Sequence, residues 1–160
     1  KLPENFQKGY HAFVIGGTYK TKILPAVKIV EIIQKLNEPV ILLGGPDDVE
    51  RAEEIIRQQT TDNRQQTLST TQILKSSNPQ ILKSSDPQIL KSLNLVGKIN
   101  LEQSASIVKK AKSVLTNDTG LMHIAAAFHK NIVSVCVYTV PELGMYPYLP
   151  NEKEKCHIIE

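Results

Sequence analysis

The feature that most constrains the fold is a repeated unit, in which a short apolar run ends on two glycines and a helix-like segment follows. Residues 12–17 (AFVIGG) and residues 40–45 (VILLGG) are two such runs. A continuous apolar run of this length is typical of a strand buried on both faces, as in a parallel sheet. Strands that alternate with helical segments predict an α/β protein with a Rossmann-like, doubly wound parallel sheet.

The segment between the two glycine-ended runs predicts a helix that stops before Pro39, because a residue that precedes proline avoids the α region. Pro25 is tolerated only in the first turn of that helix. The apolar stripe has a spacing of about three residues and consists of Ile23, Leu24, Val27, Val30, Ile33 and Leu36.

The alternation continues along the rest of the chain. Asp47 is expected to begin a helix whose capping box Glu50 completes, and Asn100 and Gln103 form a second such pair. The helix after Asn100 has an apolar stripe made of Leu101, Ala105, Val108 and Ala111. We expect further strands at residues 94–97, 113–116 and 132–137, and a helix over residues 121–129.

Residues 60–93 break the pattern. An eight-residue unit (QILKSSNP, QILKSSDP, QILKSL) repeats between residues 72 and 93, with prolines at positions 79 and 87 that exclude one continuous helix. Each unit has a single Ile-Leu pair, which cannot offset the entropy lost when eight residues become ordered. We therefore expect a low-complexity, mobile surface insertion, with a tandem docking motif as the alternative.

Charge and cysteine content exclude several classes of protein. Lys plus Arg total 19 and Asp plus Glu total 16, a net charge of +3 that is too small for a nucleic-acid-binding surface. The apolar runs are far shorter than the roughly 18 residues of a membrane span, and no signal peptide opens the chain. The two cysteines form no disulfide framework or zinc motif, so we expect a reduced, cytoplasmic protein without a metal.

The start and end of the chain favour a piece of a longer protein. The sequence has no initiator Met and ends on Ile158-Ile159-Glu160, which is typical of a strand. Residues 1–160 are therefore expected to form one domain of a larger enzyme.

Ligands of open parallel sheets bind beyond the carboxyl ends of the strands, and three turns are expected there. The most informative is the turn at residues 117–123 (NDTGLMH), because Thr119, Gly120 and Leu121 fall at a helix start, where free amides favour a phosphate. Asp118 would repel phosphate, so it either caps the helix or accepts from a sugar hydroxyl. A plain Asp N-cap followed by a tight turn explains the same residues.

The other two turns are weaker signals. Residues 16–22 (GGTYKTK) offer Thr18 and two lysines, whose flexible charges suit a diphosphate but are also common on a solvated surface. Asp47 or Asp48 could bind ribose hydroxyls, although helix capping is a sufficient explanation. His123 is more often a packed, hydrogen-bonded histidine than a catalytic one when it lies on such a helix.

These motifs together resemble glycosyltransferase family 9, the bacterial lipopolysaccharide heptosyltransferases. The resemblance is carried by residues 115–127 (LTNDTGLMHIAAA), where Asp-Thr-Gly-x-x-His precedes an alanine-rich helix. Further matching segments occur in the family order, at residues 16–25, 42–48, 95–103 and 140–147. The period-eight insertion has no counterpart in the family pattern, and Lys20 competes with Lys22 for the single family lysine.

The resemblance implies the donor-binding, carboxyl-terminal lobe of a GT-B glycosyltransferase. Such an enzyme transfers heptose from ADP-heptose to a lipid A–core acceptor with inversion and without a metal or other cofactor, at the inner face of the membrane. The carry-over assigns the diphosphate to Thr18, Lys22, Thr119, Gly120 and Leu121. It assigns the donor sugar to Asp118, the ribose to Asp48 and a supporting role to His123.

The family's catalytic base belongs to the amino-terminal lobe, so the resemblance implies that this chain alone binds donor weakly and catalyses no transfer. Two other functions stay open on the sequence. One is a doubly wound module without catalysis that binds a regulator or partner, and the other is one lobe of a sugar-nucleotide epimerase.

Overall fold

The computed structural model describes residues 2–17, 23–71, 91–135, 146–150 and 152–159, with only the backbone given for residues 62–71. Its centre is a six-stranded parallel sheet with the order β3-β2-β1-β4-β5-β6. The strands are β1 (His11–Val14), β2 (Val40–Leu43), β3 (Ser92–Asn94), β4 (Ser113–Thr116), β5 (Asn131–Val135) and β6 (Cys156–Ile159).

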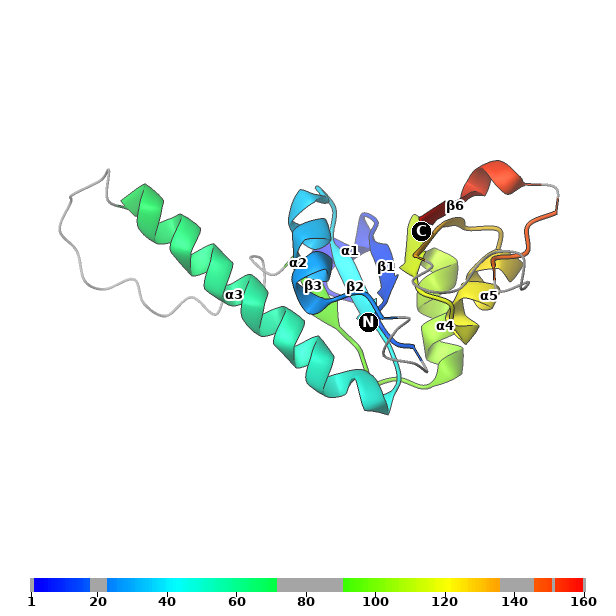
Figure 1. Cartoon of the computed structure of the whole chain (residues 1–160), viewed down its shortest axis with the longest axis horizontal. Helices are drawn as coiled ribbons and strands as arrows, with labels where there is room; N and C mark the ends of the chain where they lie inside the picture. The colour runs from blue at the N-terminus through cyan, green and yellow to red at the C-terminus, as the bar shows by residue number, and fades with distance from the viewer. Residues whose placement is uncertain (1, 18–22, 72–90, 136–145, 151, 160) are drawn as a thin grey trace.

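Helices cover both faces of the sheet, and Figure 1 shows α2 and α3 on one side and α4 and α5 on the other. The helices are α1 (Glu4–Gln7), α2 (Ala26–Lys35), α3 (Val49–Thr71), α4 (Leu101–Lys110) and α5 (Gly120–Ala127). Two 3₁₀ turns, η2 (Pro46–Asp48) and η4 (Lys153–Lys155), precede α3 and β6. The doubly wound α/β sheet predicted from the alternation is confirmed.

Alternate residues of the central strands build two separate cores. Ala12 and Val14 of β1 face α1, α4 and α5, whereas Phe13 and Ile15 face α2 and α3. All four residues of β2 are buried, which explains why its sequence is continuously apolar rather than alternating.

Several element boundaries predicted from the sequence need correction. Glu50 does not complete a capping box with Asp47, because a 3₁₀ turn comes first and the Asp48 carboxylate accepts from the Gly45 amide at 2.8 Å. The third strand lies at residues 92–94 rather than 94–97. Asn94 is its last residue and pairs with Leu42, and the chain then turns, with the Asn94 side chain accepting from the Val96 amide at 3.0 Å.

Two residues assigned to apolar stripes are exposed. Val27 is 55% exposed, because α2 turns Ile29, Val30 and Ile33 toward the sheet and leaves Val27 beside that face. Leu101 is 65% exposed, since α4 buries Val108 instead. The predicted Asn100–Gln103 capping box is confirmed, with reciprocal hydrogen bonds of 2.8 and 3.0 Å.

The predicted insertion at residues 60–93 is bordered by regular structure. Helix α3 continues through residues 60–71, away from the sheet in Figure 1, and β3 begins at Ser92. Residues 72–90, which contain most of the period-eight repeat, lie outside the described residues, so their mobility stays a prediction.

Candidate functional site

A cleft of about 760 Å³ opens at the carboxyl ends of the central strands. The order of the sheet places β1 beside β4, and the crossover helices leave these two strands toward opposite faces. Ligands of doubly wound sheets bind at this switch point. The cleft is lined by Val14, Gly16, Gly17, Gly44, Gly45, Pro46, Asp47, Asp48, Ile99, Asn100, Leu101, Ser104, Thr119, Gly120 and Leu121.

The Asp48 carboxylate lies directly against two glycines that end neighbouring strands. A Cβ added to Gly16 would lie 2.3 Å from Asp48 Oδ2, and one added to Gly44 would lie 2.9 Å from it. Only glycine at both positions leaves room for this carboxylate. The diglycine endings of the first two strands therefore place Asp48 at the floor of the cleft.

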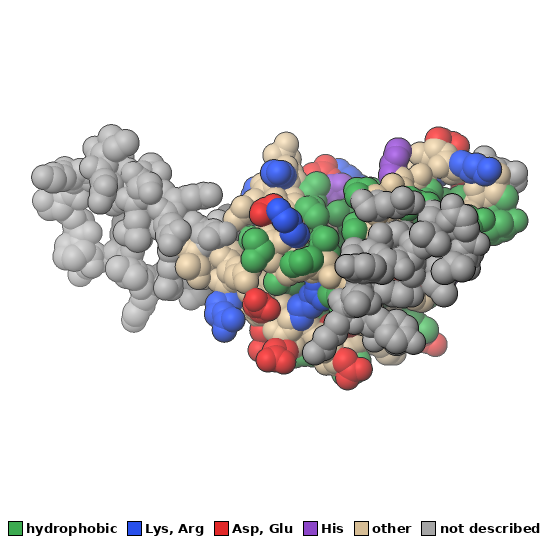
Figure 2. Space-filling model, viewed as in Figure 1, with side chains coloured by type: hydrophobic (Ala, Val, Ile, Leu, Met, Phe, Trp, Pro, Cys, Tyr) green, Lys and Arg blue, Asp and Glu red, His purple; other side chains and the backbone are tan. Residues whose placement is uncertain are grey.

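Arg51 is a cation that interacts electrostatically with Asp48 and moderates its charge. Arg51 follows Asp48 by one turn at the start of α3. Burial lowers the pKa of Arg51, and the carboxylates of Asp48 and Glu54 partly offset that lowering. Figure 2 shows acidic side chains with some basic ones along the lower edge of the molecule, where α3 begins. Arg51 reduces the repulsion that an anionic ligand in the cleft would meet from Asp48.

Helix α5 begins at the opposite wall of the cleft. Its N-cap is Thr119 rather than Asp118, and the Thr119 side chain makes no capping hydrogen bond. A Cβ added to Gly120 would meet nothing within 4 Å, so the space beside the first turn of the helix is open, and this turn lines the cleft. Those amides have no partner within the helix itself, and they carry the positive end of its dipole.

The hydroxyl of Thr119 is engaged in the turn that precedes α5. Thr116 Oγ1 donates to the carbonyl of Asn117 at 2.7 Å and lies 3.2 Å from Thr119 Oγ1. Because Thr116 has a single proton, Thr119 is the donor in that second contact. The backbone amides, rather than the Thr119 hydroxyl, are thus the donors that α5 offers to a ligand.

The structure brings together four of the residues predicted for the site. Asp48, Thr119, Gly120 and Leu121 all line the cleft, although they come from turns about 70 residues apart in the sequence. Asp118 is half-buried and His123 is exposed, and neither belongs to the lining. Thr18, Lys20 and Lys22 lie outside the described residues, directly after Gly16 and Gly17 of the cleft.

One wall of the cleft was not predicted from the sequence. Ile99, Asn100, Leu101 and Ser104 come from the start of α4, and the exposed Leu101 side chain borders the cleft rather than packing in the core. Its place in the chain could have identified it, because this segment follows β3 and therefore lies at the same edge of the sheet as the other two turns.

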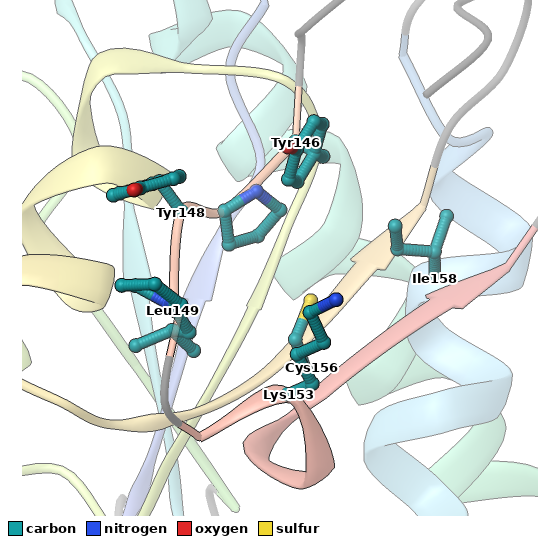
Figure 3. A pocket seen from close by; sticks show the side chains of 8 residues that line it. Tyr146, Tyr148, Leu149, Lys153, Cys156 and Ile158 are labelled. Carbon is teal, nitrogen blue, oxygen red and sulfur yellow. The ribbon is translucent and has the colours of Figure 1, made fainter. Parts of the chain in front are cut away.

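A second pocket of about 350 Å³ lies beside β6 (Figure 3). Tyr146, Tyr148 and Leu149 line it from the segment before η4, opposite Cys156 and Ile158 of β6. Its surface is largely aromatic and aliphatic, with Lys153 as a charged group on its wall.

The described part of the chain contains neither a membrane-spanning helix nor a metal-binding cluster. No helix in that part of the chain has the length and apolar composition needed to cross a membrane. Among the same residues, no three histidine, cysteine or acidic side chains gather in a way that could hold a metal ion.

Comparison with known proteins identifies the family. The model of glycosyltransferase family 9 (heptosyltransferase) matches residues 1–158. The chain belongs to glycosyltransferase family 9. The resemblance found in the sequence motifs is therefore confirmed.

Relatives within glycosyltransferase family 9 match parts of the sequence. Lipooligosaccharide heptosyltransferase 2 of Haemophilus influenzae is 37% identical over 67 residues, which are 42% of this chain and 18% of that protein. Lipopolysaccharide heptosyltransferase 2 of Escherichia coli is 40% identical over 42 residues, which are 26% of this chain and 12% of that protein.

Solved structures share the fold over nearly the whole chain. The ADP-heptose lipopolysaccharide heptosyltransferase II of E. coli has a TM-score of 0.67 at 21% identity, over 99% of this chain and 44% of that one. The E. coli heptosyltransferase WaaC, solved with ADP, has a TM-score of 0.65 at 20% identity, over 99% of this chain and 39% of that one. The chain thus spans less than half the length of these family members.

Proposed function

We propose that the cleft is the donor site of a heptosyltransferase and binds ADP-heptose or a closely related nucleotide sugar. The observation that supports this most directly is the open space at Gly120 in the first turn of α5, which lines a cleft at the switch point of the sheet. A helix start of this kind favours a phosphate. Membership of glycosyltransferase family 9 and the ADP-bound state in which WaaC was solved favour a nucleoside diphosphate.

The proposed donor spans the cleft from one wall to the other. The amides of Thr119, Gly120 and Leu121 bind the diphosphate, with Thr18 and the Lys22 ammonium as further ligands from the first turn. Asp48 accepts hydrogen bonds from the ribose, and the apolar wall formed by Ile99 and Leu101 contacts the base. Asp118 contacts the sugar at the rim, and His123 supports the α5 turn from the outer side.

The proposed transfer is metal-independent and inverts the anomeric centre. Charge develops on the diphosphate as the sugar leaves, and amides that are already oriented toward it stabilise that charge without reorganisation. Lys22 supplies the positive charge that a metal would otherwise provide. The catalytic base and the binding site for the lipid A–core acceptor belong to the other lobe of a GT-B enzyme, so this chain alone is expected to bind donor weakly and to transfer no sugar.

Calorimetric titration of the 160-residue chain with ADP and ADP-heptose, in the presence of EDTA, tests the proposal. We expect binding that Lys22→Ala and Gly120→Val each weaken by at least about tenfold, a loss of roughly 1.4 kcal/mol. Lys28→Ala is the matched control, because Lys28 is an exposed lysine that pairs with Glu31 on α2. Equal affinity of all four proteins for ADP would contradict the proposed anion site.

A further inference from the structure

Asn117 joins the ends of the two strands between which the cleft opens. Asn117 follows β4 directly and is buried, with 1% of its surface exposed. Its Nδ2 donates to the carbonyl of Gly16 at 3.3 Å. Gly16 comes two residues after the last ladder pair of β1 and β4, Val14 with Thr116. The contact therefore extends the connection between these strands beyond their backbone ladder.

The orientation of the Asn117 amide is fixed by its partner. A carbonyl oxygen only accepts hydrogen bonds, so the nitrogen of the amide must face Gly16. Oδ1 consequently points away from Gly16, and it is buried without a hydrogen-bond partner among the described residues.

This arrangement does not favour stability. A buried acceptor without a partner has lost its hydrogen bonds to water, and the single 3.3 Å contact to Gly16 is too long to offset that loss fully. An unpartnered buried group in a native structure calls for an explanation other than folding. Asn117 lies between two residues that line the cleft, Gly16 and Thr119. Its position therefore indicates that the unpartnered amide serves the cleft rather than the stability of the fold.

The turn that contains Asn117 is held internally by other groups. Thr116 Oγ1 donates to the Asn117 carbonyl, and Thr119 Oγ1 donates to Thr116 Oγ1. These bonds keep residues 116–119 together as a unit. The Asn117 side chain links that unit to the end of β1.

We propose that Asn117 is a positioning residue, whose side-chain amide sets the spacing between the end of β1 and the start of α5 so that the α5 amides point at the diphosphate. The inference rests on the proposed function, because it concerns the same donor site. Asn117 itself does not line the cleft and does not touch the ligand in this role.

The test is Asn117→Asp, measured with ADP as the probe. At neutral pH the new carboxylate faces the Gly16 carbonyl, oxygen to oxygen, and forces the two walls apart. Burial raises the pKa of such a carboxyl, as do the nearby carboxylates, Asp48 against Gly16 and Asp118 next in the chain. Near pH 5 the protonated acid can donate to the carbonyl again.

The quantity to compare is the ratio of the ADP dissociation constants of the variant and the unsubstituted chain, and we expect this ratio to change with pH. We expect the variant to bind ADP at least about tenfold more weakly than the unsubstituted chain at pH 7.5, and within about threefold at pH 5. Taking the ratio at each pH removes the titration of ADP itself. The matched control is Gln59→Glu, which replaces an amide with a carboxyl at a buried position beside Ser92 at the edge of the sheet. This variant should bind ADP about as tightly as the unsubstituted chain at both pH values.

Asn117→Ser keeps the test decisive should the aspartate variant fail to fold at neutral pH. Serine is uncharged and too short to reach Gly16, so we expect at least fivefold weaker ADP binding at both pH values without recovery. The positioning role alone would be overturned if either folded variant bound ADP at pH 7.5 as tightly as the unsubstituted chain. It would also be overturned if Gln59→Glu lost as much ADP affinity as the Asn117 variants. Absence of ADP binding by the unsubstituted chain would overturn both this role and the proposed function.

Discussion

Individual residues of the cleft act largely by leaving space. Gly16 and Gly44 make room for the Asp48 carboxylate, whereas Gly120 leaves the front of α5 open. The same residue type thus has two different roles in one site. Substitution of these glycines should separate the roles experimentally.

Gly16→Ala is expected to destabilise the fold. The new Cβ would lie 2.3 Å from Asp48 Oδ2 and push the carboxylate away from the Gly45 amide. Loss of that hydrogen bond together with the steric strain should lower the free energy of unfolding by about 1–3 kcal/mol. Urea unfolding measures the effect.

Gly45→Ala is the matched control for this prediction, because its Cβ would meet Asp48 Oδ2 at an ordinary 3.7 Å. The two alanine variants should therefore differ clearly in their urea midpoints. Equal midpoints would show that the close packing of Asp48 on Gly16 does not constrain the fold.

Some residue assignments could be made from the sequence and others could not. Asp48, Gly120 and their neighbours were found because glycines and caps mark strand ends in the sequence. Leu101 was assigned to the core, since helical spacing alone does not show which side of a short helix faces the sheet. The Asn117–Gly16 contact joins positions 101 residues apart, which no local pattern reveals.

At the scale of elements, Tyr10 connects the start of β1 to α4. Its buried hydroxyl donates to the Ile107 carbonyl at 2.8 Å, and burial raises the pKa of Tyr10 to about 12. In the unfolded chain the phenol ionises near pH 10. The folded state therefore binds the proton more tightly over the interval between these values.

Stability should fall as the pH rises from 10 toward 12, by up to about 1.4 kcal/mol per pH unit from this group. Tyr10→Phe removes the ionisation, so the variant should show a shallower decline over that interval. At pH 7 it should lose only about 0.5–1.5 kcal/mol through the missing hydrogen bond. Chemical denaturation at several pH values checks both effects, and parallel alkaline declines would contradict the assignment.

Element boundaries were predicted well where a local signal exists. Strand β4 and the capping box of α4 lie where the sequence placed them, because alternation and reciprocal caps involve neighbouring residues. The start of α3 and the position of β3 were displaced by side-chain hydrogen bonds to the backbone, from Asp48 and Asn94. Such local bonds compete with regular structure and are poorly encoded in apolar periodicity.

At the scale of the whole molecule, two exposed ion-pair clusters join distant segments. Glu38 accepts from Lys112, which lowers the pKa of Glu38, and it also faces His11. Glu152 accepts from Lys155 and His129, which lowers the pKa of Glu152. Both carboxylates lie at the surface, so salt should weaken their contribution.

The lowered pKa values predict a specific loss of stability in acid. The contribution of each carboxylate is complete above its ordinary pKa near 4.5 and disappears as the pH falls through the lower folded value. The double variant Glu38→Gln, Glu152→Gln should therefore have a flatter melting-temperature profile between pH 5 and pH 3. Glu53→Gln, at an exposed position of α3, is the control, and a flattening of equal size there would contradict the prediction.

We expect the fold to tolerate deletion of the period-eight segment. Replacing residues 72–90 with a short glycine-serine linker should change the unfolding free energy by less than about 0.5 kcal/mol and leave ADP affinity unchanged. Lys91 must remain, because its carbonyl accepts from the Val40 amide at 2.7 Å. If the deletion abolished ADP binding, the segment would belong to the donor site. If it instead abolished binding of a partner protein, the docking alternative would be favoured.

The packing of Asp48 on two glycines has a consequence for descent within the family. Three positions far apart in the sequence share a single small volume, so a change at one of them restricts what the other two can become. Lineages that acquire a larger residue at position 16 or 44 should have first replaced the aspartate at 48 with a shorter residue. The order of such substitutions in a reconstructed ancestry would then record the geometry of the cleft floor.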